Sequence, residues 1–194
     1  MRSLVVARHA ESELNVGNVL NGDPSVRVQL TELGCEQALA LGELVGPVEL
    51  VAHTSFERTR RTAELAWPGR PLLEVPDLNE IAFGCWEGTR WSDGYEAWVR
   101  SSGPDDVCPG GGESRVAAAL RYLEGFRTLL GRAEERVALV AHGAPVRYLL
   151  LAASGRPPPP LLAHVPFAEP HELTRGEVER AIEVLAEWTA APAF

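Results

Sequence analysis

Short apolar runs and longer amphipathic stretches alternate along this chain. The runs at residues 3–7, 47–55 and 136–145 are rich in Val, Leu and Ala, which is typical of buried strands. A briefer apolar run at residues 71–80 predicts a short strand that continues into a loop. The strands that this pattern predicts are therefore widely separated in the sequence.

Apolar residues recur at helical spacing between these strands. We expect helices over five stretches, which are residues 30–45, 58–67, 114–133, 146–155 and about 174–187. Thr31, Ser114 and Thr174 stand at helix starts, where a side-chain oxygen can accept a hydrogen bond from a backbone N–H of the first turn. Gly155 is placed to end the fourth helix.

Strands that alternate with helices predict an α/β fold, namely a three-layer α/β/α sandwich with a mostly parallel central sheet. No internal repeat or long linker divides the chain, so we expect a single domain over residues 1–194. Residues 84–113 interrupt the alternation, because they are rich in Gly, Trp and acidic residues. We expect one short helix there within irregular structure, which would form a partial lid or a substrate-specificity insertion.

The composition is ordinary for a globular protein, with 45% hydrophobic and 23% charged residues. No apolar run reaches the length that crosses a bilayer. Residues 1–7 lack a small-residue cleavage site, so we interpret them as a first strand and not as a signal peptide. These features predict a cytoplasmic protein without a membrane partner.

All 18 basic residues are Arg, and the formal net charge is -9. The absence of Lys excludes a Walker-type phosphate lysine and a Schiff-base lysine, so any anion held by cationic side chains is held by Arg or His. The negative charge argues against a nucleic-acid partner. Cys35, Cys85 and Cys108 form no CxxC pair, so we expect reduced structural thiols and neither a zinc knuckle nor a disulfide framework.

Each predicted strand ends in polar residues. These residues are Arg8 and His9 after the first strand, His53, Thr54, Ser55 and Arg58 after the second, Asn79 and Glu80 after the third, and His142 and Gly143 after the last. Ligands bind beyond the carboxyl ends of the strands in open α/β sheets, so we expect two His, two Arg and one Glu to converge at one edge. Any one of these residues, taken alone, would be an ordinary structural or surface group.

Two imidazoles with two guanidiniums suit a phosphoryl group. Arg binds phosphate oxygens in bidentate fashion, and a neutral imidazole nitrogen is a competent nucleophile toward phosphorus. Zinc is the rival use of two histidines, but a tetrahedral site needs more ligands, and Arg8 beside His9 would repel a cation. We therefore predict a site for a small phosphorylated substrate, with no metal and no cofactor.

The motifs that contain these residues resemble those of the histidine phosphatase superfamily, which includes the cofactor-dependent phosphoglycerate mutases. Residues 8–15, RHAESELN, are similar to the family's opening motif R-H-G-E-[ST]-x-x-N. Residues 55–63, SFERTRRTA, resemble S-x-L-x-R-A-x-Q-T-A, which places Arg58 on the family arginine. Residues 78–88, LNEIAFGCWEG, resemble L-x-E-x-x-F-G-x-W-E-G.

Shorter matches extend this resemblance to about residue 150. They are the first helix at residues 30–38, the GGES segment at residues 111–114, and the His142-Gly143 pair followed by Arg147. The tail after Gly155 matches weakly. The resemblance implies a phosphoglycerate mutase-like fold.

The resemblance also implies a role for each residue of the site. His9 would be the nucleophile that accepts the phosphoryl group, while Arg8, Arg58 and His142 would surround the phosphoryl oxygens. Glu80 would protonate the departing oxygen and later take a proton from water. Further contacts to the phosphate or the substrate would come from Ser12, Asn15, Asn21, Gly22 and Gly143.

The chain departs from the family pattern at several positions. Ala10 replaces a Gly, and would be strained if the backbone there needs a positive φ, or would otherwise narrow the pocket. Thr59 and Arg61 replace Ala and Gln on a helix, where we expect tolerance. Pro145 removes a backbone N–H donor after His142.

Three functions remain open at this level. The leading one is a metal-independent phosphomonoesterase that forms a phosphohistidine, because the chain is short and its FGCWEG block resembles the phosphatase branch. The second is a phosphoglycerate mutase, and the third is a catalytically weak protein that binds phosphorylated ligands. The natural substrate and the oligomeric state are open, with a homodimer among the candidates.

Aromatic residues of the 84–113 segment have two uses open to them. Trp86, Trp91, Tyr95 and Trp98 would either stack on a ring or sugar of the substrate or pack the segment against the sheet. His164 and His171 fall in irregular sequence, and we assign them no role.

Overall fold

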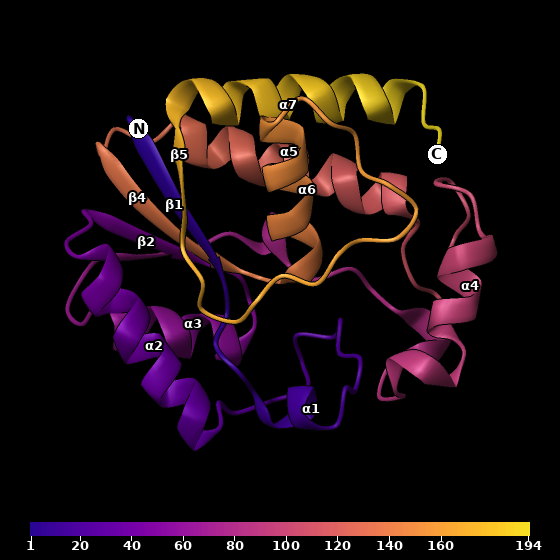
Figure 1. Ribbon diagram of the computed structural model, residues 1–194, viewed down its shortest axis with the longest axis horizontal. Helices are drawn as coiled ribbons and strands as arrows, with labels where there is room; N and C mark the ends of the chain where they lie inside the picture. Colours follow the sequence, from indigo (N-terminus) through magenta and orange to yellow (C-terminus); the bar gives the residue numbers. More distant parts are fainter.

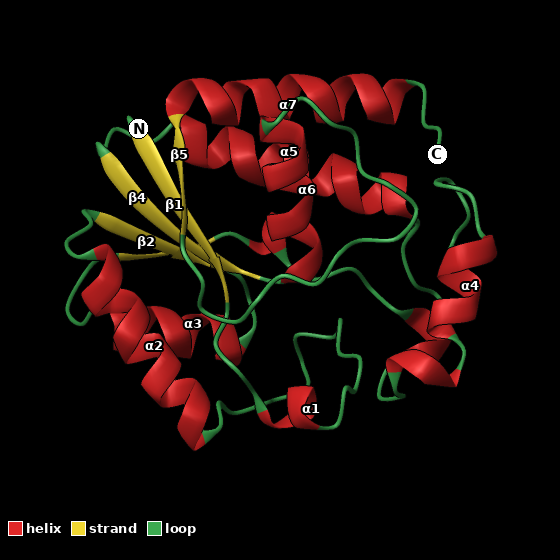
Figure 2. Cartoon of the chain, in the orientation of Figure 1, coloured by secondary structure: helices red, strands yellow, loops and turns green.

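A five-stranded sheet forms the centre of the computed structural model, which describes residues 1–194 (Figure 2). The strands are β1 (Ser3–Arg8), β2 (Leu50–His53), β3 (Leu72–Glu74), β4 (Arg136–Ala141) and β5 (His171–Thr174). Their order across the sheet is β3-β2-β4-β1-β5. All neighbours are parallel except β5, which pairs with β1 in the antiparallel direction. The predicted α/β fold with a mostly parallel sheet is confirmed.

Helices cover both faces of this sheet. The α-helices of the chain are α1 (Glu13–Val16), α2 (Glu32–Val45), α3 (Glu57–Ala66), α4 (Tyr95–Ser101), α5 (Arg115–Leu130), α6 (Gly143–Ala153) and α7 (Arg175–Ala190). Helices α2 and α3 lie on one face, and α5, α6 and α7 lie on the other (Figure 1). The sheet is therefore the middle of three layers.

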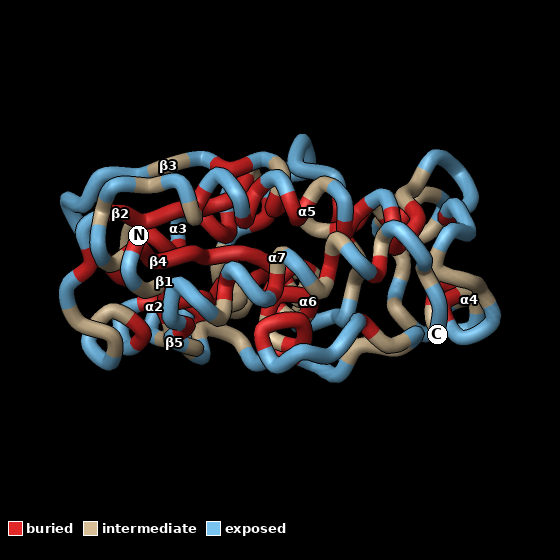
Figure 3. The backbone as a smooth tube through the Cα atoms, turned by 90° about the horizontal axis from the view of Figure 1, so that it is seen from above, coloured by how far each residue is buried: buried red, intermediate tan, exposed pale blue.

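The hydrophobic core divides into two clusters because alternate strand residues point to opposite faces. Leu4 and Val6 of β1 belong to the larger cluster beneath α5, α6 and α7, whereas Ala7 belongs to the smaller cluster beneath α2 and α3. Figure 3 shows the buried backbone along β1, β2 and β4, and the exposed residues on the outer surface. Burial on both faces explains why β1 and β4 are almost continuously apolar in sequence.

Three predicted helix caps are present. The side-chain oxygens of Thr31, Ser114 and Thr174 accept hydrogen bonds from the backbone N–H three residues later. None of the helices is both long and apolar enough to cross a membrane.

Two boundaries differ from the sequence prediction. Strand β4 ends at Ala141, and α6 already begins at Gly143, with His142 as its N-cap. Pro145 therefore lies in the first helical turn, where its missing N–H would have had no partner within the helix. Strand β5 was not predicted at all, because only one of its four residues, Leu173, is buried.

The 84–113 segment contains one short α-helix, as predicted, together with brief 3₁₀ turns at Gly84–Trp86 and Trp91–Asp93. Four aromatic side chains pack against one another there, with Trp86, Trp91 and Trp98 each lying 5.1–5.7 Å from the Tyr95 ring. Aromatic packing therefore joins this Gly-rich segment to the larger core cluster.

Candidate active site

His9 and Arg58 meet at the carboxyl ends of the strands. His9 directly follows β1, and its backbone N–H donates a hydrogen bond to Ala141 O over 2.8 Å, which continues the pairing with β4. Arg58 lies in the first turn of α3, and its Nε donates to His9 Nε2 over 3.1 Å. His142 follows β4, and its ring centroid lies 5.3 Å from that of His9. The strand ends thus bring together residues that are far apart in the chain.

The His9 imidazole is held in one tautomer. Its Nδ1 lies 2.8 Å from the carbonyl oxygen of Ala10, which can only accept, so Nδ1 carries the hydrogen. The other nitrogen, Nε2, carries no hydrogen, and its lone pair accepts the hydrogen bond from Arg58 Nε. Burial, with the charges of Arg58 and Arg8, holds the pKa of His9 well below its usual range. The ring is neutral at neutral pH, which is the form that a nucleophile requires.

The His142 ring is buried behind the site and held at both nitrogens. Arg58 Nη2 donates to Nδ1 over 3.3 Å, so Nε2 carries the hydrogen and donates to Thr54 Oγ1 over 2.8 Å. The Thr54 hydroxyl bonds to that of Thr59, which donates to the carbonyl oxygen of Phe56. Burial is the main reason that the pKa of His142 is lowered, and the charge of Arg58 adds to it. His142 does not line the cavity, and it contacts Arg58, which does.

Thr59, which we expected to tolerate change, lies at the end of this hydrogen-bonded chain and is fully buried. Its hydroxyl sets the direction of every bond as far as His142, because its proton goes to a backbone carbonyl. The helical position of Thr59 gave no sign of this role, since Thr54 lies before the helix and His142 lies far away in the chain.

The Arg58 guanidinium is buried among groups that accept its hydrogens. Its Nη1 and Nη2 donate to the side-chain and backbone oxygens of Asn21, and the guanidinium lies 4.2 Å over the Phe56 ring. Burial lowers the pKa of Arg58 to about 10, while the nearby Glu80 opposes that shift. The side chain is therefore fixed in place and still charged at neutral pH.

The tail of the chain folds back over Arg8, the last residue of β1. Arg8 Nη1 donates to Val165 O and lies within hydrogen-bond distance of His164 Nε2, each over 3.0 Å, and its guanidinium lies 4.1 Å over the Phe167 ring. The pKa of His164 is lowered by burial and by Arg8, so the neutral ring accepts this bond. His164, to which we assigned no role, is thus a partner of Arg8.

Glu80 is a buried carboxyl at the same site. Burial raises its pKa above the usual range, although the N–H of Ile81, the charges of Arg8 and Arg58, and the N–H of Ala144 at the start of α6 oppose the shift. A carboxyl group in this condition holds a proton at a higher pH than an exposed one, so it can serve as an acid.

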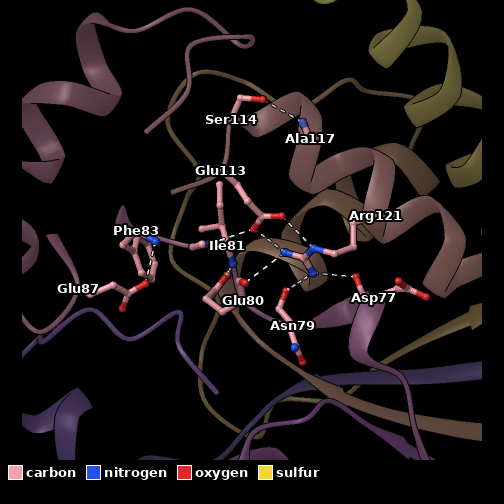
Figure 4. Close-up of polar contacts among 11 residues, drawn as sticks. Asp77, Asn79, Glu80, Ile81, Phe83, Glu87, Glu113, Ser114, Ala117 and Arg121 are labelled. Atoms are coloured by element: carbon pink, nitrogen blue, oxygen red, sulfur yellow. Dashed lines mark hydrogen bonds and ion pairs between the residues drawn. The ribbon is translucent and has the colours of Figure 1, made fainter. Parts of the chain in front are cut away.

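Arg121 holds the loop that carries Glu80 (Figure 4). Its guanidinium donates to the backbone carbonyl oxygens of Asp77, Asn79 and Glu80 over 2.9–3.3 Å, and it forms an ion pair with Glu113 over 2.7 Å. Glu113 also accepts from the N–H of Ala82. This network fixes the backbone on both sides of Glu80. Glu113 belongs to the GGES segment, whereas Arg121 had no signal in the sequence, because most of its partners are backbone oxygens.

The five predicted substrate contacts divide into two groups. Ser12, Asn15, Asn21 and Gly143 line the cavity in front of His9. Ser12 Oγ donates to Asn15 Oδ1 over 2.6 Å, so these two side chains orient each other. Gly22 does not line the cavity.

Gly22 packs closely against the loop that follows Glu80. Its N–H donates to Glu87 Oε2 over 2.8 Å, and a Cβ at this position would lie 2.2 Å from the carbonyl oxygen of Ile81. Close packing against the residues after Glu80 therefore explains this glycine. Ala10 also has a simple explanation, because its φ is not positive and its methyl group is buried away from the cavity, where its N–H donates to Thr62.

A cavity of about 520 Å³ opens in front of His9, Arg8, Arg58 and Glu80. It is enclosed by residues after β1, by the 84–113 segment and by the tail at residues 160–167, and most of its lining residues are hydrophobic. Trp91 and Tyr95 line it, whereas Trp86 and Trp98 do not. The cysteines are free thiols, and no group of three or more His, Cys, Asp or Glu side chains is arranged to hold a metal ion.

The sequence of the chain is similar to two kinds of enzyme. A 2,3-bisphosphoglycerate-dependent phosphoglycerate mutase of Methylobacterium sp. (strain 4-46) is 35% identical over 178 residues, which cover 79% of this chain and 81% of the relative. A metal-independent phosphoserine phosphatase of Arabidopsis thaliana is 30% identical over 162 residues, which cover 76% of this chain and 67% of the relative.

The fold and the family agree with these relatives. The solved structure of a mycobacterial glucosyl-3-phosphoglycerate phosphatase in complex with VO3 superposes with a TM-score of 0.73 at 28% identity, covering 90% of this chain and 91% of that chain. Residues 4–190 match the sequence model of the histidine phosphatase superfamily (branch 1). A match over nearly the whole chain, together with the fold, leads to one conclusion: the chain belongs to branch 1 of the histidine phosphatase superfamily.

Proposed function

We propose that this chain is a metal-independent phosphomonoesterase that transfers a phosphoryl group to His9 and then to water. The observation that carries the proposal is the His9 imidazole, which is neutral, fixed with its hydrogen on Nδ1, and placed beside Arg8, Arg58 and the protonatable Glu80. Nucleophile, cations and acid are thus present in one cavity.

In the first step, the Arg58 Nε–H turns from His9 Nε2 to an oxygen of the incoming phosphoryl group. The released lone pair of Nε2 then attacks phosphorus while the bond between phosphorus and the ester oxygen breaks. The departing oxygen takes the proton of Glu80 and leaves as an alcohol. Arg8 and Arg58 stabilise the charge on the phosphoryl oxygens. The ring of phosphorylated His9 carries a positive charge, which the carbonyl of Ala10 stabilises through the hydrogen on Nδ1.

In the second step, water attacks the phosphorus atom of phosphohistidine. Glu80, now a carboxylate, takes a proton from this water, and the bond between phosphorus and Nε2 breaks. Inorganic phosphate leaves, and both His9 and Glu80 return to their starting protonation states. His142 acts through Arg58, because it accepts a hydrogen bond from that guanidinium.

The cations of the cavity favour hydrolysis over mutase chemistry. A phosphoglycerate mutase must hold a carboxylate or a second phosphate besides the phosphoryl group that it transfers. The lining Arg residues are Arg8, Arg58 and Arg115, and the first two flank His9. Arg115 already donates to the backbone oxygens of four residues, so it has no guanidinium edge left for a second anion.

The experiment is turnover of p-nitrophenyl phosphate in the presence of EDTA, with quenching in alkaline detergent to recover the phosphoenzyme. We expect turnover and an acid-labile, alkali-stable phosphoryl label on the wild type. His9→Asn should lower kcat by at least about 10³-fold and abolish the label. His171→Asn is the matched control, because His171 lies on the edge strand β5 and outside the cavity. A His9→Asn variant with full activity would overturn the proposal, and ligand binding without turnover would favour a phosphate-binding protein.

A mutase is the second candidate, because the relative from Methylobacterium carries that activity at 35% identity. Incubation with 3-phosphoglycerate and a 2,3-bisphosphoglycerate primer distinguishes the two. We expect release of inorganic phosphate or no reaction. Formation of 2-phosphoglycerate faster than phosphate release would show a mutase instead.

A further inference from the structure

We propose that the cavity selects phosphomonoesters whose alcohol portion is uncharged and mainly apolar, of the size of an aromatic ring or larger. Esters that carry a second anionic group would be poor substrates. This inference rests on the proposed phosphatase function and concerns the part of the cavity that would hold the alcohol.

Three segments supply an apolar wall around that part. The 84–113 segment contributes Trp91, Tyr95 and Val99, and the tail contributes Leu161 and Leu162. Leu14, Val19 and Leu20 come from the α1 region. Both α1 and α4 lie beyond the carboxyl ends of the strands, so these walls face the space in front of His9 (Figure 1). An apolar alcohol would leave water on entering, which is favourable in proportion to its buried area.

The same part of the cavity has no free cation. Arg115 donates to the carbonyl oxygens of Val99, Pro160, Ser102 and Gly103 and to the Ser102 hydroxyl over 2.5–3.0 Å. Its remaining donor, Nε, is buried, and the guanidinium lies 4.6 Å over the Phe194 ring. Arg115 is therefore bound to the protein itself and joins the 84–113 segment to the tail.

The lining carboxyl groups supply no counter-ion for a second anion. Glu80 and Glu96 are the lining carboxyl groups, and Glu96 is paired with Arg100 over 2.7 Å. A carboxylate on the alcohol portion would lose its water next to these groups without gaining a counter-ion, which is costly. An apolar ring meets no such cost.

The size of the cavity fits such a substrate. Its volume of about 520 Å³ lies within the roughly 300–1,000 Å³ of ordinary small-molecule sites. A phosphoryl group occupies only the end beside His9, and the rest would be left as poorly solvated apolar space by a substrate as small as a glycerate.

The test compares three esters of primary alcohols, so that the chemistry of the leaving group stays similar. Benzyl phosphate is apolar, glycerol 1-phosphate is polar and uncharged beyond its phosphate, and 3-phosphoglycerate carries a second anion. We expect kcat/KM for benzyl phosphate to exceed that for glycerol 1-phosphate by about 10- to 100-fold, the ratio expected from burying one aromatic ring. The value for 3-phosphoglycerate should be the lowest of the three.

Two variants test whether the apolar wall of the cavity causes this selectivity. Trp91→Ala should lower kcat/KM for benzyl phosphate about tenfold more than that for glycerol 1-phosphate, mainly through KM. Leu162→Arg adds a cation to the apolar wall, so it should raise the ratio of 3-phosphoglycerate to benzyl phosphate turnover. Leu39→Arg, on the exposed side of α2, is its charge-matched control and should leave the ratio unchanged. Inhibition by inorganic phosphate checks that the end beside His9 is intact in each variant.

The outcomes separate the two proposals. Equal or faster turnover of 3-phosphoglycerate by the wild type, with the phosphoenzyme formed, would overturn the inference and leave the phosphatase function standing. No phosphoenzyme and no turnover of any ester, p-nitrophenyl phosphate included, would overturn the phosphatase function itself. A Leu162→Arg variant that folds, binds inorganic phosphate and keeps the wild-type ratio would also contradict the inference.

Discussion

The two ends of the cavity are built in different ways. The end beside His9 is formed by residues at strand ends and helix starts, and by Glu80 on the loop that Arg121 holds. Each of its polar side chains is held by hydrogen bonds to the protein. The other end is formed by loops, the short helix α4 and the tail, and most of its wall is apolar. A regular scaffold thus holds the groups that would carry out the chemistry, whereas irregular segments shape the space for the substrate.

Charge is also used differently at the two ends. Arg58 is fixed by its bonds to Asn21 and remains beside the His9 nucleophile. Arg115 donates its hydrogens to backbone carbonyl oxygens, and these bonds hold the loops together. The same residue type therefore supports chemistry at one end and stability at the other, and variants can separate these roles.

Glu80→Gln should have the largest effect of these variants, because the amide can neither give a proton to the alcohol nor take one from water. We expect kcat for benzyl phosphate to fall by about 10²- to 10⁴-fold. Nitrophenolate is a good leaving group, so p-nitrophenyl phosphate should still give a rapid burst of about one equivalent per enzyme. Rapid-mixing absorbance measures the burst, and equal losses of both phases would contradict this division of labour.

Arg58→Met and Arg115→Met apply one change to both ends of the cavity. Arg58→Met should lower kcat about 10²- to 10³-fold, since a positioned charge is lost next to the phosphoryl group. Arg115→Met should instead lower the free energy of unfolding by about 2–4 kcal/mol, because several buried carbonyl oxygens lose their donor. Its kcat, measured on the folded fraction, should change less than tenfold.

Denaturant titrations and steady-state kinetics on both Arg variants test this contrast. A stability loss at Arg58 as large as that at Arg115, with similar changes in kcat, would erase the difference between the two ends.

The two buried histidines beside the cavity, His9 and His142, make the free energy of unfolding depend on pH. The pKa values of His9 and His142 are lowered in the folded state and return to about 6.5 in the unfolded chain. Below about pH 6.5 the unfolded chain therefore binds more protons, and stability falls by up to about 1.4 kcal/mol per pH unit for each ring. The raised pKa of Glu80 has the opposite effect on stability, because the folded chain keeps the Glu80 proton at a pH where the unfolded chain has lost it. The contribution of the histidines is therefore measured as a difference between variants.

His9→Asn should reduce this slope between pH 7 and pH 5, relative to the wild type. Urea unfolding at a series of pH values measures both. Identical slopes in the wild type and His9→Asn would show that the His9 ring takes up a proton freely when folded.

Thr59→Ala should have the smallest effect. It removes the last hydroxyl in the chain of bonds that ends at His142, and we expect a loss of about 1 kcal/mol in stability. Because the Thr54 hydroxyl would then be free to turn, the NMR signals of the His142 ring should broaden or shift. Thr128→Ala, at an exposed position of α5, is the matched control. An unchanged His142 spectrum would show that Thr59 has no part in orienting the ring.

The sequence by itself determined the layers and the groups at the strand ends. Continuous apolar runs predicted β1, β2 and β4, and Thr31, Ser114 and Thr174 marked helix starts, because these signals arise between residues close in the chain. The parallel sheet then placed Arg8, His9, Arg58, Glu80 and His142 at one edge. Local periodicity and strand topology were sufficient for this much.

Only the tertiary structure decided how those groups are used. The bonds of His164 and Phe167 to Arg8, the carbonyls that occupy Arg115 and the link from Thr59 to His142 all join segments that have no spacing signal in common. The edge strand β5 and the apolar cavity likewise depend on where the tail folds back. Such contacts are set by packing over long sequence separations, so the specificity of the site could be seen only in three dimensions.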